Sequence, residues 1–178
     1  PAPSSVPWES ESGLDAMSTE AALHARHADP VVLDRLPAPP DGLVVRIAPD
    51  EAWLVGSRAS RTVLVRDAHA AVGGAAGGLA VDQTDGWVIW SIRGEPPPVV
   101  LGRLMIAPIP AAVTSFVQGA ITGVPGKVLV DGDVAHLMVP APVGHHLRDR
   151  ILEVCRDLDP AIGSPRPFIQ STGASGPC

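Results

Sequence analysis

Hydrophobic and polar residues alternate most clearly over residues 87–93, after an acidic turn. Odd-numbered positions fall on one side of a strand and even-numbered positions on the other. Both sides carry large apolar residues, with Trp87 on one and Trp90 on the other. A strand that is apolar on both faces is typical of the centre of a sheet. We therefore predict a central strand here, with Trp87 and Trp90 on opposite faces.

The same analysis predicts mixed strands and helices through the middle of the chain. Further strands are expected at 43–47, 52–55, 79–82, 116–121, 127–130 and 135–139. Helices are expected at 62–72, from 99 to before Pro108, and at 143–158. The last helix has an apolar stripe made of Leu147, Ile151, Val154, Cys155 and Leu158. Because hairpins outnumber parallel crossovers, the predicted fold class is α+β.

The two ends of the chain differ from the middle. Residues 1–42 are rich in proline, serine, alanine and acid, and residues 159–178 in proline, glycine and serine. Prolines break regular elements, so only a short helix from Ser18 to His27 is expected in the first segment. Neither segment has enough large apolar residues to build its own core, so each is disordered or wraps on a partner. We therefore divide the chain into a Pro-rich arm (1–42), an α+β domain (43–158) and a tail (159–178).

Composition narrows the class of protein. Hydrophobic residues make up 46% of the 178 residues, which is enough for a substantial core. The net charge of −6 argues against a nucleic-acid partner, which usually needs a basic face. No apolar run approaches a membrane span and no charged leader is present. With only Cys155 and Cys178 available, a disulfide framework is not expected. We therefore expect a cytoplasmic protein with reduced thiols and no membrane partner.

The histidines offer few arguments for a metal site. His24 and His27 have the spacing of helical neighbours, which can share a metal. No third ligand lies nearby in the sequence, so a solvated surface is the favoured interpretation. His145 and His146 are adjacent, point in different directions on a helix and are expected to face solvent or an interface.

The remaining candidate groups have simple structural interpretations. Asp82 and Asp85 could form an acid pair, but capping of a turn explains them more simply. The glycine cluster at 73–78 lies after a helix and before a strand, the reverse of a phosphate-binding loop. Cys155 lies on an apolar stripe and is expected to be a buried, inert thiol. No Ser–His–Asp set is recognisable. We therefore expect no catalytic, cofactor-binding or metal-binding residues in this chain.

Four segments, in order, carry a family resemblance. Residues 49–55 (PDEAWLV) are similar to an early P-x-E-W-L strand, and residues 82–94 to a D-x-S…G strand. Residues 101–104 (LGRL) match the helix that follows, and residues 127–152 the closing hairpin and helix. The chain therefore resembles the aminomethyltransferase-like (GcvT/YgfZ, or GcvT/TrmE domain 1-like) fold. It resembles most closely the gamma subunits of heterotetrameric sarcosine oxidases.

This resemblance implies a non-catalytic small subunit. It would stabilise a multisubunit flavin-dependent amine oxidase or demethylase that acts on sarcosine or another N-methylated amine. The partners would be larger flavoprotein subunits, and they, not this chain, would hold FAD, FMN, NAD, tetrahydrofolate and zinc. One of Trp87 and Trp90 is expected in the core and the other at a subunit interface, where tryptophan is enriched. Trp87, nearer the turn, is favoured for the interface.

Two alternatives remain open at this stage. The chain could be a stand-alone tetrahydrofolate-binding aminomethyltransferase-like protein, or an interaction module of a different oxidoreductase complex. The folate-binding relatives carry acidic residues in the hairpin region that hold the pterin. Here no Asp or Glu occurs from Leu104 to Val130. Because a pterin needs a carboxylate to accept its ring N–H and amino donors, we expect no folate binding.

Overall fold

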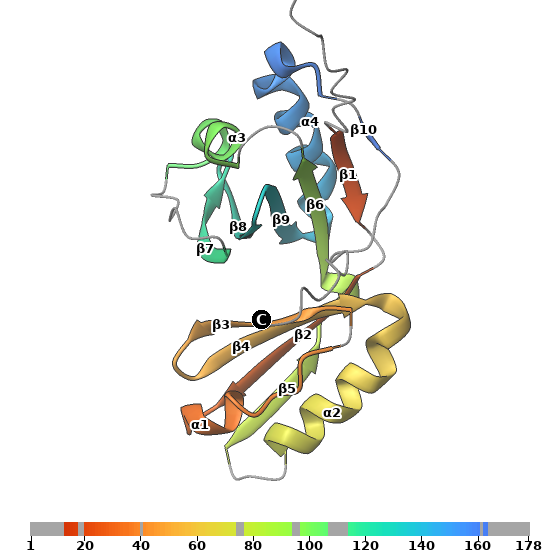
Figure 1. The fold of residues 1–178 in the computed structure, drawn as a ribbon, viewed down its shortest axis with the longest axis vertical. Coiled ribbons are helices and arrows are strands. Elements are labelled where there is room, and N and C mark those ends of the chain that lie inside the picture. Colours follow the sequence, from red (N-terminus) through yellow and green to blue (C-terminus); the bar gives the residue numbers. More distant parts are fainter. Residues whose placement is uncertain are drawn as a thin grey trace, which may run out of the picture.

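Two β-sheets pack against each other through a shared apolar layer, and helices cover their other faces (Figure 1). The computed structural model describes residues 13–17, 20–39, 41–73, 77–93, 97–106, 114–160 and 162–163. The six-stranded sheet has the order β10-β1-β6-β9-β8-β7, and the four-stranded sheet has the order β3-β4-β2-β5.

The bounds of the elements follow the predicted order through the middle of the chain. The strands are β1 (Gly13–Met17), β2 (Glu20–His27), β3 (Leu43–Ala48), β4 (Glu51–Ser57), β5 (Gly78–Asp82), β6 (Trp87–Arg93), β7 (Thr114–Ile121), β8 (Val124–Asp131), β9 (Val134–Pro140) and β10 (Ile162–Gly163). The α-helices are α1 (Pro30–Leu33), α2 (Arg61–Gly73), α3 (Pro97–Leu104) and α4 (Gly144–Val154). Every strand and helix predicted between residues 43 and 158 is confirmed, and the fold is α+β.

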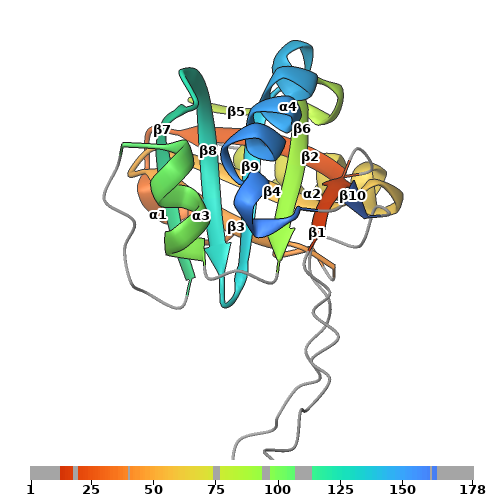
Figure 2. The same ribbon diagram turned by 90° about the horizontal axis from the view of Figure 1, so that it is seen from above.

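The six-stranded sheet is built on hairpins around β6. Both neighbours of β6, β1 and β9, run antiparallel to it, and Trp90 lies opposite Leu137 in the register. Helices α3 and α4 lie over β6, β9, β8 and β7 (Figure 2). The predicted stripe of α4 is confirmed, because Leu147, Ile151 and Cys155 are buried against this face. Burial of this apolar stripe, rather than helix propensity, holds the helix in place.

The four-stranded sheet has two apolar faces. One face packs on α1 and α2 through Leu23, Leu54 and Leu64. The other face meets the six-stranded sheet, where Trp53 packs with Ile89 in one buried cluster. The result is a four-layer arrangement of helices, sheet, sheet and helices, in which the turn between β5 and β6 carries the chain from one sheet to the other.

The predicted helix from Ser18 to His27 is wrong. Residues 20–27 form β2, which lies between β4 and β5 in the four-stranded sheet. Alanine, glutamate and leucine favour a helix locally, but burial of Leu23 and pairing on both edges override that preference. The strand β2 lies before the expected arm boundary at residue 43, and β3 begins at that residue. Both strands belong to the four-stranded sheet, so the expected boundary divides this sheet.

The expected tail lies mostly outside the described residues. Within it, Ile162 and Gly163 form β10, which pairs in parallel with β1 at the edge of the six-stranded sheet. None of the helices in the described part of the chain is long and apolar enough to cross a membrane.

Candidate partner-binding site around Trp87

Trp87 opens β6 at the point where the chain passes between the two sheets. The strand β5 ends at Asp82, a 3-10 turn covers Thr84–Gly86, and β6 begins in the other sheet. Trp87 is half-buried, whereas Trp90, on the opposite face, is only 6% exposed and donates its Nε1–H to the carbonyl oxygen of Gly144. The predicted placement on opposite faces is confirmed. The interface role of either tryptophan remains a prediction.

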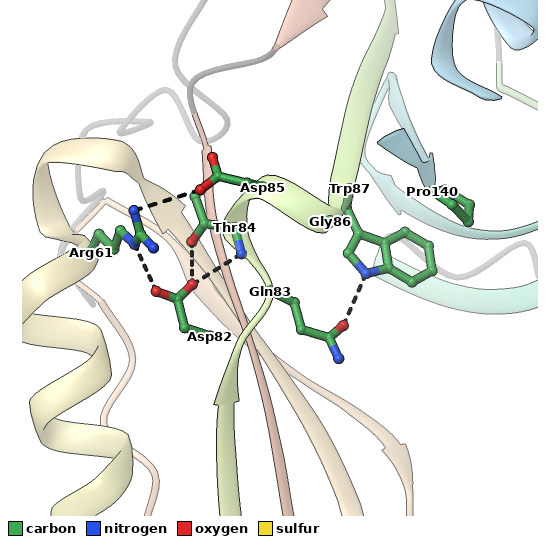
Figure 3. A pocket seen from close by; sticks show the side chains of 8 residues that line it. All are labelled: Arg61, Asp82, Gln83, Thr84, Asp85, Gly86, Trp87 and Pro140. Carbon is green, nitrogen blue, oxygen red and sulfur yellow. Dashed lines mark hydrogen bonds and ion pairs between the residues drawn. The ribbon is translucent and has the colours of Figure 1, made fainter. Parts of the chain in front are cut away.

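The turn before Trp87 is held by the carboxylate of Asp82 (Figure 3). One of its oxygens accepts hydrogen bonds from the backbone N–H of Thr84 at 3.0 Å and from its hydroxyl at 2.7 Å. The other accepts a hydrogen bond from Nε of Arg61 on α2 at 2.7 Å. Burial raises the pKa of Asp82, but the Thr84 hydrogen bonds and Arg61 outweigh this effect and leave the pKa lowered. The carboxylate therefore stays charged and ties helix, turn and sheet together.

Asp85 does not pair with Asp82. Its carboxylate accepts a hydrogen bond from Arg58 at 2.7 Å and lies 3.8 Å from Arg61. The interpretation of Asp82 as a turn cap is confirmed, and Asp85 belongs to a partly exposed ion-pair network. Ion pairs this exposed contribute little to the free energy of unfolding. The hydrogen bonds between Asp82 and the buried Thr84 therefore contribute most of the stability of this turn, which we call the Asp82 clasp.

The indole of Trp87 is fixed on two sides. Its Nε1–H donates to the side-chain oxygen of Gln83 at 2.9 Å. Its ring meets the ring of Trp53 edge to face, with centroids 4.8 Å apart. Trp53 comes from β4 in the other sheet and is 2% exposed. The partly exposed face of Trp87 is therefore presented in a defined orientation.

Lys127 on β8 completes this cluster. Its Nζ lies 4.1 Å from the ring centroid of Trp87 and 4.4 Å from that of Trp53, which is cation–π distance for both. Burial lowers the pKa of Lys127, and the nearby carboxylate of Glu51 offsets part of this lowering. Glu51 itself lies 2.7 Å from Nε2 of His24. No carboxylate of the described residues lies within ion-pair distance of Lys127 Nζ.

Two open hollows flank the Trp87 ring. One, of about 560 Å³, lies over the Asp82 clasp, with Arg61 and Asp85 on its wall. The other, of about 430 Å³, lies over β7 and β8, with Lys127 and Gln118 on its wall. Trp87 and Pro140 line both. We call this continuous area, centred on Trp87 and Pro140, the Trp87 surface. An aromatic ring between a polar hollow and a mostly apolar one is the kind of anchor that protein interfaces use.

His24 and His27 do not form a helical pair. Both lie on β2, three residues apart, and therefore on opposite faces of the sheet. His27 is 5% exposed, and its Nδ1 accepts a hydrogen bond from the backbone N–H of Asp29 at 2.9 Å. The predicted solvated surface is thus wrong for His27, because the strand turns it inward. Among the described residues, no group of three metal-binding side chains occurs.

The other predicted residues lie where the sequence places them. His145 and His146 are exposed at the start of α4. Cys155 is 3% exposed, and burial raises the pKa of its thiol, so the expected burial is confirmed. Cys178 lies outside the described residues.

Sequence reasoning missed Trp53, Arg61 and Lys127 as site residues. They come from three elements that the fold brings together over long sequence separations. One signal was available in the sequence. Lys127 is the only lysine of the chain, and the other twelve of its thirteen lysine and arginine residues are arginines.

Comparisons with known proteins show the fold. No family model matches the sequence, and no curated protein is similar to it. A chain of the heterotetrameric sarcosine oxidase from Corynebacterium sp. U-96, solved with pyrrole 2-carboxylate, superposes with a TM-score of 0.71 at 14% identity. The match covers 83% of this chain and 85% of that chain.

Two enzyme structures match over smaller shares of their length. Glycine cleavage system aminomethyltransferase T from Bartonella henselae has a TM-score of 0.62 at 12% identity, covering 86% of this chain and 47% of that one. Aspartate kinase from Synechocystis has a TM-score of 0.51 at 7% identity, covering 89% and 28%. This chain thus spans about half of the aminomethyltransferase. Together the matches show a GcvT-like α+β fold.

Proposed function

We propose that this chain is a non-catalytic small subunit of a multisubunit flavin-dependent amine oxidase or demethylase that acts on sarcosine or another N-methylated amine. Its partners are larger flavoprotein subunits. Those subunits hold the FAD, FMN, NAD, tetrahydrofolate and zinc of the complex, and this chain binds none of them. Its task is to stabilise the assembly.

The observation that carries this proposal is how fully the sarcosine oxidase chain is matched. The superposition covers 85% of the sarcosine oxidase chain and 83% of this chain, so the two chains have nearly equal length. The aminomethyltransferase, in contrast, extends well beyond the matched part, which is 47% of it. The nearly complete match to a chain of a heterotetrameric oxidase thus supports the role of a subunit in such a complex better than that of a transferase.

The Trp87 surface is the docking site in this proposal. The ring of Trp87 is oriented by Gln83 and Trp53, so little side-chain entropy is lost when a partner covers it. Pro140 adds a rigid apolar flank. Arg61 and Asp85 form a charged rim on one side. An anchored aromatic centre with a polar rim is the usual anatomy of a protein interface.

Co-purification of the tagged full chain from its native source tests this function. We expect it to bring down larger subunits in fixed stoichiometry, with a flavin absorbance spectrum and oxidase activity toward an N-methylated amine. Trp87→Ala should reduce this recovery. The matched control is Val63→Ala, which removes an exposed apolar side chain from α2 that lines neither hollow of the Trp87 surface. A chain that elutes alone as a monomer, with neither flavin nor partners, contradicts the proposal.

A stand-alone tetrahydrofolate-binding protein is the second candidate, because the aminomethyltransferase shares the fold. Against it stands the absence of any Asp or Glu from residue 104 to 130, the region where a pterin would need a carboxylate. Calorimetric titration of the full chain with tetrahydrofolate separates the two. Micromolar binding by the isolated chain favours this candidate, and no heat of binding favours the small subunit.

A further inference from the structure

The chain has a single lysine, and it sits in an unusual place. Lys127 is the only lysine among the thirteen lysine and arginine residues. It lies in the middle of β8, half-buried, with its Nζ over the rings of Trp53 and Trp87. Its side chain also lines the hollow of about 430 Å³ on one side of Trp87.

An arginine would serve a purely structural or anion-binding role at least as well. The guanidinium group stacks on aromatic rings and grips carboxylates or phosphates with two parallel hydrogen bonds. It never loses its proton in a protein, whereas a lysine can become a neutral amine when it is buried. Lysine at position 127 therefore allows a chemistry that arginine cannot supply, that of a nucleophilic amine.

We propose that the hollow beside Lys127 is a capture site for a small uncharged aldehyde, which Lys127 binds reversibly as an imine. This activity goes beyond the proposed role as a small subunit and does not depend on it. It belongs to the chain free of a partner, because the hollow is part of the Trp87 surface. Three features of the site support it: an amine without an ion-pair partner among the described residues, an open hollow beside it, and two indole faces beneath it.

The reaction needs no redox partner. The neutral Nζ attacks the carbonyl carbon, and a proton moves to the oxygen to give a carbinolamine. Loss of one water molecule then gives the imine, and addition of water reverses the step. Burial lowers the pKa of Lys127, which raises the fraction of neutral amine. The protonated imine is again a cation at the same position, so the rings of Trp53 and Trp87 stabilise it as they do the ammonium group.

The lining of the hollow limits the ligand. Besides Lys127 and the amide of Gln118, its wall consists of Trp87, the prolines 125 and 140, and small residues of β7 and β8. Lys127 is the one ionisable group among the residues that line it. Once Lys127 is bound to the carbonyl, no second cation among the described residues that line this hollow remains to hold a carboxylate or a phosphate. The ligand is thus an uncharged aldehyde rather than a keto acid or a sugar phosphate.

Reductive trapping on the purified full chain tests this inference. The chain is incubated with acetaldehyde and cyanoborohydride at several pH values, and peptide mass mapping follows labelling at Lys127 separately from the terminal amine. The matched reference is the same chain unfolded in guanidinium chloride, in which the same lysine is free of the fold. We expect the folded chain to react several-fold faster at neutral pH, with its rate reaching a plateau at lower pH than that of the unfolded chain.

Two variants and a second aldehyde test whether labelling depends on the hollow and on Lys127. Ala120 is exposed and lines the hollow, so Ala120→Phe should fill it and slow labelling while thermal melting stays unchanged. Lys127→Arg should melt like the wild type and lose this labelled peptide. Glyoxylate should label Lys127 no faster in the folded chain than in the unfolded chain.

Labelling by acetaldehyde that is equally fast or slower in the folded chain than in the unfolded chain overturns the proposal. A folding advantage for glyoxylate refutes the uncharged ligand. Because no partner subunit is present, failure here leaves the docking role untouched.

Discussion

The indole of Trp87 meets the indole of Trp53 edge to face, at a centroid distance of 4.8 Å and an interplanar angle of 89°. Trp87 belongs to the six-stranded sheet and Trp53 to the four-stranded sheet, so the pair is a direct contact between the sheets. Such pairs contribute about 0.5–1.5 kcal/mol beyond the area they bury. The surface proposed for docking is therefore continuous with the packing that joins the sheets.

Trp90 is the tryptophan that fills the core, so Trp90→Ala should strongly destabilise the fold. The substitution leaves a cavity under α3 and α4 and removes the hydrogen bond to the carbonyl oxygen of Gly144. We expect the free energy of unfolding to fall by about 3–5 kcal/mol, measured by chemical denaturation. Trp90→Phe, which keeps most of the volume, should cost clearly less. Equal losses for both variants would mean that the hydrogen bond, and not packing, dominates.

Trp87→Ala should act mainly on assembly. The ring is half-buried, so the fold should persist with a smaller loss of stability than Trp90→Ala causes. If Trp87 anchors a partner, its removal should weaken binding to the larger subunits by about 2 kcal/mol or more, measured as the dissociation constant. Trp87→Phe keeps an aromatic ring and should restore part of the affinity. Unchanged affinity in Trp87→Ala would remove the interface role.

The placement of Trp87 and Trp90 could be predicted from the sequence because it depends on a local rule. Side chains alternate along a strand, whatever the strand pairs with. The connection between the predicted strands at 127–130 and 135–139 is local in the same sense. The antiparallel strands β8 and β9 meet in a tight turn in which Gly132 takes a positive φ of 60°.

The strand β2 could not be predicted in this way. Its residues favour a helix, and their strand conformation comes from pairing with β4 and β5, which lie later in the sequence. The cluster of Trp53, Trp87 and Lys127 depends on that pairing and on the contact between the sheets. No local pattern specifies it, although the isolated lysine marked one member.

His136 should make the protein sensitive to mild acid. Burial, with a smaller contribution from the charge of Arg93, lowers its pKa from 6.5 to about 3. Between these values the unfolded chain binds a proton and the folded chain does not, so stability falls as pH falls. The slope should approach about 1.4 kcal/mol per pH unit below pH 6. Denaturation in guanidinium chloride at several pH values between about 4.5 and 7.5 measures it.

His136→Asn is the matched variant for this slope. The asparagine amide can take over the hydrogen bond that Ser91 Oγ makes with Nδ1 of His136 at 2.7 Å. The variant should lose much less stability than the wild type between pH 6.5 and 4.5. The lowered pKa of Asp82 acts in a different window, since its stabilisation is lost only as pH falls below the ordinary aspartate pKa of 3.8. Parallel profiles for wild type and variant would show that His136 is protonated in the folded state.

Gly78 should be among the least replaceable residues of the four-stranded sheet. A Cβ at this position would lie 1.8 Å from the carbonyl oxygen of Val72 at the end of α2. Both atoms are fixed by backbone, so Gly78→Ala must push α2 away from β5 and should cost about 3 kcal/mol or more. Gly102→Ala is the control, because nothing lies within 4 Å of its Cβ position and α3 should gain about 1 kcal/mol from the better helix former. Thermal melting should therefore shift in opposite directions for the two variants. If Gly78→Ala has the same melting temperature as the wild type, α2 does not approach β5 as closely as described. No side-chain movement could relieve a clash with a backbone oxygen.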